Sequence, residues 1–387
     1  MLYIRCSHGL RPRYTTARTV ETVRYMHKKT EKEMKVIVDN KIPFIREAIG
    51  QIADEVVYLP GKAFTPEAVR DADALIIRTR TLCNRQLLEG SRVRFIATAT
   101  IGFDHIDTEY CRQAGIGWTN APGCNSASVA QYLQSTLLLL QQHRPDRPLA
   151  GLTLGIVGAG NVGSKVAEVG KRLGMKVLLN DLPREEREGH DGFASLAQLA
   201  TECDVISFHV PLYKEGKYKT LHLADAAFFG SLQRRPVIIN TSRGEVIETG
   251  ALLRALDSGQ IADAVIDVWE NEPDINLELL GKVFIGTPHI AGYSADGKAN
   301  ATRMSLDALC RFFHLTAQYA IEPPQPATPV ITASSLTEAA LQMYDPRRDC
   351  DALRQHPELF EQLRGDYPLR RERRAFTLVT PQQYQLF

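Results

Sequence analysis

A glycine-rich loop near the middle of the chain is the feature that most restricts its fold. The segment Gly158-Ala159-Gly160-Asn161-Val162-Gly163 follows a short apolar run and precedes a helical pattern that extends to Leu173. In such a loop the first glycine permits a tight turn, the second lets the backbone approach a pyrophosphate, and the third lets the helix pack against the strand. The helix N-terminus supplies amide donors for phosphates. The pattern therefore predicts a dinucleotide-binding strand–loop–helix unit.

An acidic residue beyond this loop indicates which dinucleotide binds. Asp181 ends the predicted second strand, 18 residues after Gly163. A carboxylate in this place can accept hydrogen bonds from the adenosine ribose and would repel a 2′-phosphate, so the sequence favours NAD over NADP. Arg184 lies nearby and could offset that repulsion. A tight turn that binds no ligand is the alternative, and the combination of strand, loop, helix and acid weighs against it.

Short β-rich runs alternate with helical patterns from Met34 onward, which predicts an α/β protein built from parallel sheets. In the first series, helices are expected to begin at Pro43 and after Thr65. The strands expected there are 36–38, 55–59, 75–77, 95–97 and 116–119. This series predicts a small parallel-sheet domain.

A second series begins after a long helix that is predicted from Ser126 to Leu140. Its expected strands are 154–157, 176–179, 205–208, 237–239, 264–268 and 283–285. Six strands with intervening helices match a doubly wound dinucleotide domain. A helix from about Tyr293 to Phe313 is expected to return to the first domain, and the segment that follows Glu322-Pro323-Pro324 is expected to be a third small domain or an oligomer-forming appendage.

Three polar residues follow predicted strands of the second series. Arg243 lies in Asn-Thr-Ser-Arg-Gly, Glu272 in Glu-Asn-Glu-Pro, and His289 in Thr-Pro-His-Ile-Ala-Gly. Arginine can hold a carboxylate with two parallel hydrogen bonds, and a histidine beside a carboxylate can accept a hydroxyl proton. Singly, these residues could be a surface arginine, a turn acid and a packed histidine. At three carboxyl strand ends of one NAD domain, they together predict oxidation of a hydroxy acid.

Charge and cysteine content exclude several other classes of protein. The 46 basic and 45 acidic side chains give a net charge of +1, which argues against a bulk nucleic-acid-binding or membrane-binding surface. The 7 cysteines are scattered without a Cys-x-x-Cys pair, which favours the reducing cytoplasm and indicates no metal site. No apolar run is long enough for a membrane span. Residues 1–33 lack an apolar period and are expected to be a disordered extension or the product of an early start codon, with a weak resemblance to a transit peptide.

With these motifs the chain resembles the D-2-hydroxyacid dehydrogenase family. The resemblance is carried by the segments Gly158–Gly163, Asn240–Gly244, Asp267–Pro273 and Pro288–Gly292. Further segments narrow it to those members that oxidise 4-phospho-D-erythronate, an activity that serves pyridoxal 5′-phosphate synthesis. These segments are 121–125, 208–212, 218–223, 285–293 and 344–349. The resemblance extends from Met34 nearly to Phe387.

The resemblance implies a doubly wound parallel-sheet NAD domain inserted in a smaller flavodoxin-like α/β substrate domain, plus a C-terminal α+β dimerisation domain. The implied partners are a phosphorylated hydroxy acid and a second copy of the chain, so we expect a homodimer. The expected bounds are 1–33 for the extension, 34–126 for the substrate domain, 127–290 for the NAD-binding domain, 291–316 for the return helix and 317–387 for the dimerisation domain.

The resemblance also assigns roles to residues. It implies that Arg243 binds the substrate carboxylate, that His289 is the general base, and that Glu272 orients His289 and increases its basicity. The implied cofactor contacts are Gly158, Gly160, Asn161, Val162, Gly163, Asp181, Val210, Asp267 and Gly292. The implied substrate contacts are Thr79, Thr100 and Tyr293. Val210 stands where relatives can have threonine, so a side-chain hydrogen bond to the cofactor is lost there.

A substrate phosphate requires cationic partners, and Arg78 and Arg80 flank Thr79 while Arg347 and Arg348 lie near the C-terminus. We expect Arg78 to help bind the phosphate. Two other functions remain open at this stage. Another phosphorylated hydroxy acid, such as 3-phosphoglycerate, could be the substrate, or the fold could serve a non-catalytic NADH-sensing protein.

Overall fold

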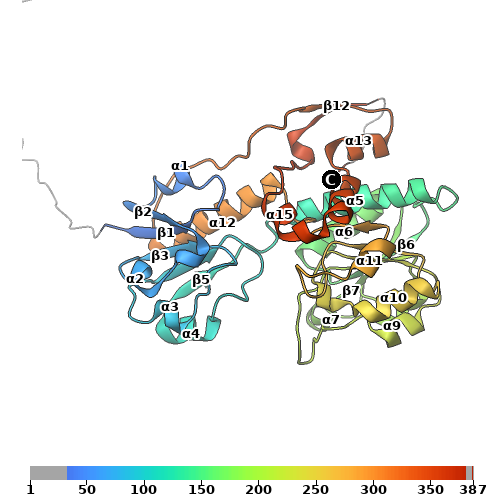
Figure 1. Cartoon of the computed structure of the whole chain (residues 1–387), viewed down its shortest axis with the longest axis horizontal. Helices are drawn as coiled ribbons and strands as arrows, with labels where there is room; N and C mark the ends of the chain where they lie inside the picture. The colour runs from blue at the N-terminus through green and yellow to red at the C-terminus, as the bar shows by residue number, and fades with distance from the viewer. Residues whose placement is uncertain (1–32, 381–385, 387) are drawn as a thin grey trace, which may run out of the picture. The chain divides into compact units, whose positions relative to one another are not determined.

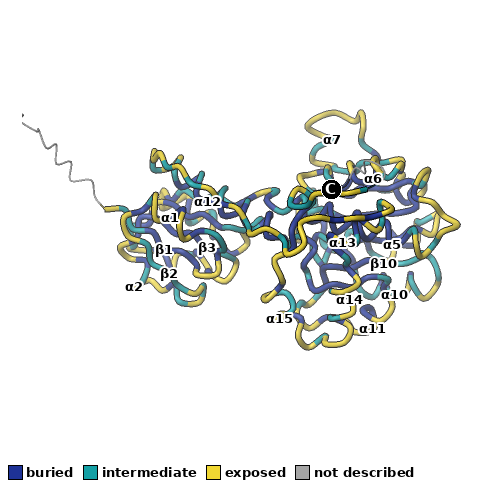
Figure 2. The backbone as a smooth tube through the Cα atoms, turned by 90° about the horizontal axis from the view of Figure 1, so that it is seen from above, coloured by how far each residue is buried: buried dark blue, intermediate teal, exposed yellow. Residues whose placement is uncertain are grey.

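The first of the two large parallel sheets is built from short strands that are mostly apolar. The computed structural model describes residues 33–380 and Leu386, so nearly all of the predicted 1–33 extension lies outside the described residues. The strands are β1 (Lys35–Asp39), β2 (Glu55–Leu59), β3 (Ala74–Ile77), β4 (Phe95–Thr98) and β5 (Gly117–Thr119), in the order β2-β1-β3-β4-β5. This is the flavodoxin-like order, and it confirms the expected parallel sheet (Figure 1). Every residue of β3 and β4 is buried, as expected for a parallel sheet that is covered on both faces (Figure 2).

Four short helices connect these strands. They are α1 (Arg46–Ile49), α2 (Pro66–Val69), α3 (Arg85–Leu88) and α4 (Thr108–Ala114). The predicted cap of α2 is present, since the Thr65 side chain accepts a hydrogen bond from the backbone amide of Ala68. The predicted start of α1 at Pro43 was wrong. Phe44 adopts a φ of 61°, which interrupts the helical conformation and places its ring against the core of this sheet.

The second sheet has six strands. They are β6 (Thr153–Val157), β7 (Lys176–Asn180), β8 (Val205–Phe208), β9 (Val237–Asn240), β10 (Asp263–Ile266) and β11 (Ile285–Gly286). The order is β11-β10-β9-β8-β6-β7, and every pairing is parallel. The chain therefore reverses its winding between β6 and β8, which confirms the doubly wound prediction. The structure ends β10 two residues earlier than predicted and starts β11 two residues later, so Asp267 lies in a loop.

Helices cover both faces of this sheet. They are α6 (Asn161–Arg172), α7 (Leu182–Glu188), α8 (Leu196–Glu202), α9 (Ala226–Ser231), α10 (Thr249–Asp257) and α11 (Leu277–Lys282). Helix α6 begins at the glycine-rich loop and has apolar side chains along one side, where Val166 and Val169 contact the sheet core. Within residues 33–380, no helix could cross a membrane.

Two long helices connect the sheets. Helix α5 (Ser126–His143) packs against α6, and its Val129, Leu133 and Leu137 belong to the core of the six-stranded sheet. Helix α12 (Ala295–Phe313) packs on the five-stranded sheet, where the Phe312 and Phe95 rings stack with 4.7 Å between their centroids. A Cβ at Gly117 would lie 2.7 Å from the Phe312 ring, so β5 needs glycine at this contact.

The C-terminal region, residues 317–380, combines helices with a two-stranded parallel sheet. Its helices are α13 (Leu336–Met343), α14 (Pro346–Gln355) and α15 (Phe360–Gly365), and its strands are β12 (Val330–Thr332) and β13 (Thr377–Val379). Buried ionic and polar contacts join this region to the rest. The Arg371 guanidinium pairs with Asp296 of α12 at 2.9 Å, and Arg370 donates to the carbonyl of Ala291 at 2.7 Å. The region is therefore fixed beside the loop that follows β11.

Candidate active site

Three neighbouring strands of the six-stranded sheet carry the three polar residues that the sequence singles out. Arg243 follows β9, Glu272 lies in the loop after β10, and His289 follows β11, and these strands are adjacent in the sheet. The first two loops also touch, because a Cβ at Gly244 would lie only 2.0 Å from the carbonyl of Trp269. The parallel arrangement therefore brings all three loops to one edge of the sheet, where ligands bind in open α/β folds.

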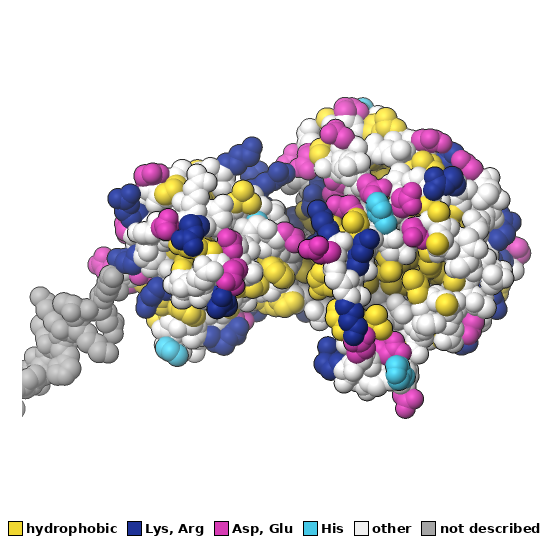
Figure 3. Space-filling model, turned by 90° about the horizontal axis from the view of Figure 1, so that it is seen from below, with side chains coloured by type: hydrophobic (Ala, Val, Ile, Leu, Met, Phe, Trp, Pro, Cys, Tyr) yellow, Lys and Arg dark blue, Asp and Glu magenta, His cyan; other side chains and the backbone are white. Residues whose placement is uncertain are grey.

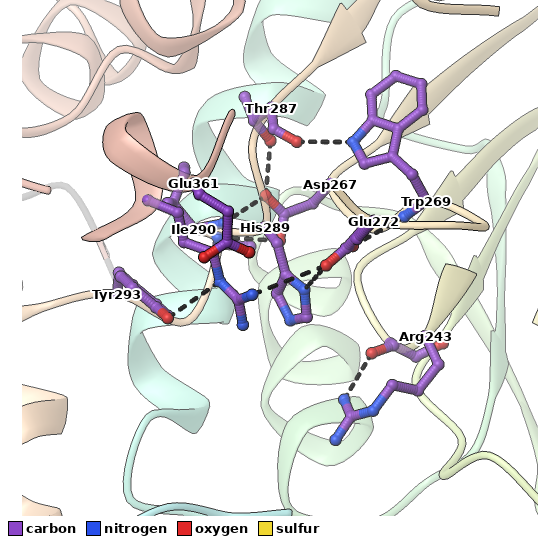
Figure 4. Close-up of polar contacts among 12 residues, drawn as sticks. Arg243, Asp267, Trp269, Glu272, Thr287, His289, Ile290, Tyr293 and Glu361 are labelled. Atoms are coloured by element: carbon purple, nitrogen blue, oxygen red, sulfur yellow. Dashed lines mark hydrogen bonds and ion pairs between the residues drawn. The ribbon is translucent and has the colours of Figure 1, made fainter. Parts of the chain in front are cut away.

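Glu272 and His289 form a direct pair. The Glu272 Oε2 atom lies 2.8 Å from His289 Nδ1, and Glu272 Oε1 accepts a hydrogen bond of 3.0 Å from the backbone amide of Trp269 (Figure 4). Burial alone would raise the pKa of Glu272, but the hydrogen bond and charge of His289 lower it overall. Glu272 is therefore a carboxylate at neutral pH. With a hydrogen on Nδ1 directed at Glu272, the other ring nitrogen of His289 is left to accept a proton.

Asp267 holds the loop that carries His289. It is 1% exposed and accepts hydrogen bonds from the Thr287 hydroxyl at 2.6 Å and from the backbone amides of Ile290 and Ala291 at 2.8 and 3.0 Å. Burial raises the pKa of Asp267, which these donors and the charge of His289 oppose. His289 itself has a φ of 56°. Three hydrogen bonds to one buried carboxylate fix this loop, so Asp267 supports the histidine whether or not it also contacts a cofactor.

The glycine-rich loop has the geometry that a dinucleotide requires. Gly158 has a φ of +92°, and a Cβ at Gly163 would lie 1.9 Å from the Gly158 carbonyl oxygen. By contrast, nothing lies within 4 Å of a Cβ at Gly160. No side chain caps the N-terminus of α6, so its first amides, at Asn161 and Val162, remain available for an anion. Gly158 and Gly163 are therefore needed for packing, whereas Gly160 leaves room for a pyrophosphate.

Asp181 is positioned by the same loop. It follows β7, and its carboxylate accepts hydrogen bonds from the backbone amides of Ala159 at 2.9 Å and Arg184 at 3.0 Å. Arg184 donates to the Ala159 carbonyl and pairs with Glu188 at 2.7 Å. The arginine that could have offset the repulsion of a 2′-phosphate is therefore engaged with an acid, which supports the preference for NAD.

Arg243 reaches the loop that follows β4 of the five-stranded sheet. A Cβ at Gly102 would lie 3.2 Å from Arg243 Nη2, while the Thr100 hydroxyl donates to the Gly102 carbonyl at 2.9 Å. Buried Asn240 shapes the arginine's loop, since its side chain donates to the Arg243 carbonyl at 2.9 Å and accepts from Ser242. Two of the predicted site residues, Arg243 and Thr100, thus meet at Gly102.

The other predicted site residues occupy more varied surroundings. Thr79 is exposed and Arg78 is partly buried directly after β3. Tyr293 follows the histidine loop, and its hydroxyl accepts a hydrogen bond of 3.1 Å from Arg364. Val210 contacts the glycine-rich loop, because a Cβ at Gly158 would lie 2.8 Å from its side chain. Gly292 leaves space for Asn125, whose amide nitrogen would lie 2.1 Å from a Cβ there, so this glycine has a packing role of its own.

Two residues near the site were missed in the sequence. Arg364 of α15 donates to the Tyr293 hydroxyl and places Nη1 3.8 Å from Glu272 Oε2, although it lies 71 residues from Tyr293 in the chain. His209, after β8, is partly buried, and burial lowers its pKa to about 3, so it is neutral. It contacts the Ser207 hydroxyl at 2.9 Å and the Thr241 hydroxyl at 3.3 Å. Only a position directly after a strand marks His209, and no local pattern marks Arg364.

Comparison with known proteins agrees with this geometry. Residues 126–291 match the family described as D-isomer specific 2-hydroxyacid dehydrogenase, NAD binding domain. Residues 325–386 match a domain of unknown function (DUF3410). The first match contains the glycine-rich loop, Asp181 and the three polar loops, so it covers the cofactor and catalytic residues together.

Two curated relatives are similar over almost their whole length. The erythronate-4-phosphate dehydrogenase of Bacteroides fragilis is 72% identical over 346 residues, which are 89% of this chain and 99% of the relative. The protein of the same name from Bacteroides thetaiotaomicron is 70% identical over the same shares. Among solved structures, D-lactate dehydrogenase from Aquifex aeolicus, complexed with NAD and lactic acid, is similar with a TM-score of 0.58 and 28% identity. The similar region covers 72% of this chain and 95% of the Aquifex aeolicus chain.

Proposed function

The chain belongs to the erythronate-4-phosphate dehydrogenases, within the D-isomer-specific 2-hydroxyacid dehydrogenase family, and we propose that it oxidises 4-phospho-D-erythronate to (R)-3-hydroxy-2-oxo-4-phosphooxybutanoate with NAD. This reaction serves pyridoxal 5′-phosphate synthesis. The observation that carries the proposal is the Glu272–His289 pair, which is joined at 2.8 Å beside the Arg243 loop. A protein that only senses NADH has no need of a proton acceptor in this place.

Each residue of the trio then has one task. Arg243 binds the substrate carboxylate with its planar guanidinium; one of its nitrogens already donates to the Ser242 carbonyl at 2.7 Å, which orients the group. His289 accepts the proton of the C2 hydroxyl through the nitrogen that faces away from Glu272. Glu272 stabilises the positive charge that His289 gains.

The cofactor completes the redox balance. Bound NAD would supply the acceptor for the hydride of C2, while His289 takes the hydroxyl proton, so the alcohol would become a ketone with the proton and the hydride both accounted for. The residues that would hold NAD are the glycine-rich loop, for the pyrophosphate, and Asp181, for the adenosine ribose. Val210 contacts the same loop, and we propose that Gly292 also contacts the cofactor. Asp267 acts through the histidine loop, since all three of its hydrogen bonds go to that loop.

Substitution of His289 by alanine tests this assignment. Loss of a positioned general base costs about 10²- to 10⁴-fold in rate, so turnover should fall by that order while the NAD dissociation constant, measured by fluorescence titration, stays unchanged. Retention of turnover would contradict the role of His289. Arg187→Ala, on the exposed side of α7, is a control for a change in a charged residue that pairs with Glu188.

The C-terminal region supports a proposal about assembly. We infer that it forms a homodimer, because large apolar side chains lie exposed on it: Val330, Leu359, Leu369 and Val379. Burial of such surface is the main favourable contribution to association. Light scattering coupled to size-exclusion chromatography should give twice the chain mass. Replacement of Leu369 and Val379 by serine should lower it toward the monomer, and a wild-type monomer at micromolar concentration would contradict the proposal.

A further inference from the structure

A lysine at the start of α12 lies beside the catalytic pair without an acidic partner. Lys298 is partly buried, and its Nζ lies 5.3 Å from the centroid of the Tyr293 ring. Among the residues that the structure describes, no carboxylate lies within 4.0 Å of this ammonium group. Lysines that are shielded from solvent normally pair with an acid, so a shielded lysine without one is a candidate to bind an anionic ligand.

Other cations lie near Tyr293 or Lys298. Arg364 donates to the Tyr293 hydroxyl and has its guanidinium carbon 5.8 Å from the ring centroid. Arg78 after β3 and Arg370 of the C-terminal region are close enough for their charges, together with burial, to lower the pKa of Lys298. Arg78 likewise has no acidic partner within the described part of the chain. The protein thus gathers positive charge from three separate parts of the sequence around Lys298 and Tyr293.

The acids in this neighbourhood are already engaged. Glu272 is paired with His289, Asp296 with Arg371 at 2.9 Å, and Glu372 accepts from the Ser294 hydroxyl at 2.8 Å. Glu361 of α15 pairs with exposed Arg80 at 2.8 Å. None of these side chains neutralises Lys298. The excess positive charge beside the active site is the arrangement that binds an anion, because charge-assisted hydrogen bonds are the strongest polar contacts available to a phosphate.

We propose that Lys298, together with Arg78, binds the phosphate group of the substrate and sets the specificity for a phosphorylated hydroxy acid. This inference rests on the proposed function and adds a residue of α12 to it. Contacts connect the subsite with the catalytic pair: the Lys298 ammonium lies over the Tyr293 ring, the Tyr293 hydroxyl accepts a hydrogen bond from Arg364, and Arg364 Nη1 lies 3.8 Å from Glu272 Oε2. A substrate with its carboxylate at Arg243 and its hydroxyl at His289 still needs a cationic partner for its phosphate, and this cluster supplies that positive charge.

The cofactor's own phosphates are the other source of such an anion. They belong at the glycine-rich loop after β6, and β6 is separated from β11 in the sheet by β10, β9 and β8. Lys298 lies in α12, which follows β11, and its neighbours Tyr293, Arg78 and Arg370 lie in the loop after β11, directly after β3 and in the C-terminal region. The structure therefore favours the substrate phosphate, and the two sources can be separated by measuring NAD binding.

The test uses the full-length chain with Lys298→Met, which keeps the length and the apolar contact with the Tyr293 ring. Inorganic phosphate is the probe, titrated by calorimetry without substrate. Phosphate should bind about tenfold to a hundredfold more weakly, as expected from loss of one charge-assisted hydrogen bond, while the NAD dissociation constant stays unchanged. Lys298→Arg should restore most of the affinity, and Lys171→Met, at an exposed lysine of α6, should behave as wild type.

Kinetics then separate this inference from the proposed function. In the wild type, kcat/KM for 4-phosphoerythronate should exceed that for erythronate, and Lys298→Met should reduce this ratio mainly through KM. A wild type that oxidises neither compound contradicts the proposed function, whereas weakened phosphate binding in Lys298→Met would still support the subsite. Unchanged phosphate affinity in Lys298→Met, or a loss confined to NAD, overturns the subsite and leaves the function in place. A lower melting temperature with unchanged phosphate affinity would show a structural role and also overturn it.

Discussion

Replacement of Glu272 by glutamine tests the contact on which the catalytic assignment rests. Glutamine keeps the size and an acceptor oxygen but removes the charge that stabilises protonated His289. Both side chains are largely shielded, with exposed fractions of 17% for Glu272 and 24% for His289, so solvent screens the pair only weakly. A charge-assisted hydrogen bond contributes about 1.5–3 kcal/mol. We therefore expect kcat/KM to fall by about 10- to 150-fold, with an unchanged NAD dissociation constant.

The chain contains a matched control two residues away. Glu270 forms the same kind of pair, with Oε1 2.7 Å from His222 Nε2 and Oε2 accepting from the Thr249 amide, but His222 is outside the site. The assay is initial-rate NADH formation at 340 nm, with NAD binding measured separately. Glu270→Gln should keep kcat/KM within about twofold, since surface pairs contribute little. Equal losses in both variants, or a Glu272→Gln enzyme within twofold of wild type, would refute the reasoning.

The Glu272–His289 pair should also make the stability of the protein depend on pH in the acidic range. The pKa of Glu272 in the folded protein lies below its ordinary value of 4.5, because His289 hydrogen-bonds and attracts the carboxylate. The stability that this contributes is therefore fully present above that ordinary value and is lost as the pH falls through the lowered pKa. The difference in free energy of unfolding between wild type and Glu272→Gln should shrink across that acidic range and stay constant near neutrality.

Three further substitutions have defined outcomes. Asp267→Asn places an amide where three hydrogen-bond donors converge, so one buried donor would be left without an acceptor. Urea denaturation should therefore show that the free energy of unfolding falls by about 1–3 kcal/mol. Unchanged stability would contradict the role of Asp267 in the loop. Asp181→Ser removes both an acceptor for the ribose and a charge that repels a 2′-phosphate. The ratio of kcat/KM with NADP to kcat/KM with NAD should therefore rise by about tenfold or more. An unaltered ratio would argue against a contact between Asp181 and the ribose. Arg364→Met should lower kcat/KM by about twofold to tenfold, as for one hydrogen bond of about 0.5–1.5 kcal/mol, and no change would exclude a positioning effect on Tyr293 and Glu272.

The fold was predictable because its signals are local. Each signal acts within a few residues: the glycine-rich loop, the proline after Thr65 and the alternation of apolar runs. Together they predicted both large parallel sheets and NAD as the cofactor. The start of α1 was not predictable in the same way. Phe44 follows Pro43 in a pattern that suits a helix, yet it has a φ of 61° and packs against the core of the five-stranded sheet.

The site was predictable only in part, for a related reason. Arg243, Glu272 and His289 each follow a strand, so their approach to one sheet edge follows from the topology. Nothing near Arg364 or Lys298 in the chain indicates that either faces the site. Arg364 depends on the docking of the C-terminal region, and Lys298 is distinguished only by the acids that are absent around it. The whole chain has almost equal numbers of acidic and basic residues, so its composition does not indicate a local excess of positive charge. Figure 3 shows both signs of charge interspersed on the face drawn there.

One measurement tests the central claim most directly: NADH formation by the purified chain with 4-phosphoerythronate, 3-phosphoglycerate, glycerate and lactate, each at equal concentrations of NAD. The arrangement of Arg243, Glu272 and His289 with a cationic cluster beside them predicts the highest kcat/KM for 4-phosphoerythronate. It also predicts that the two substrates without phosphate are the poorest. Equal rates with all four, or a preference for lactate, would contradict the account.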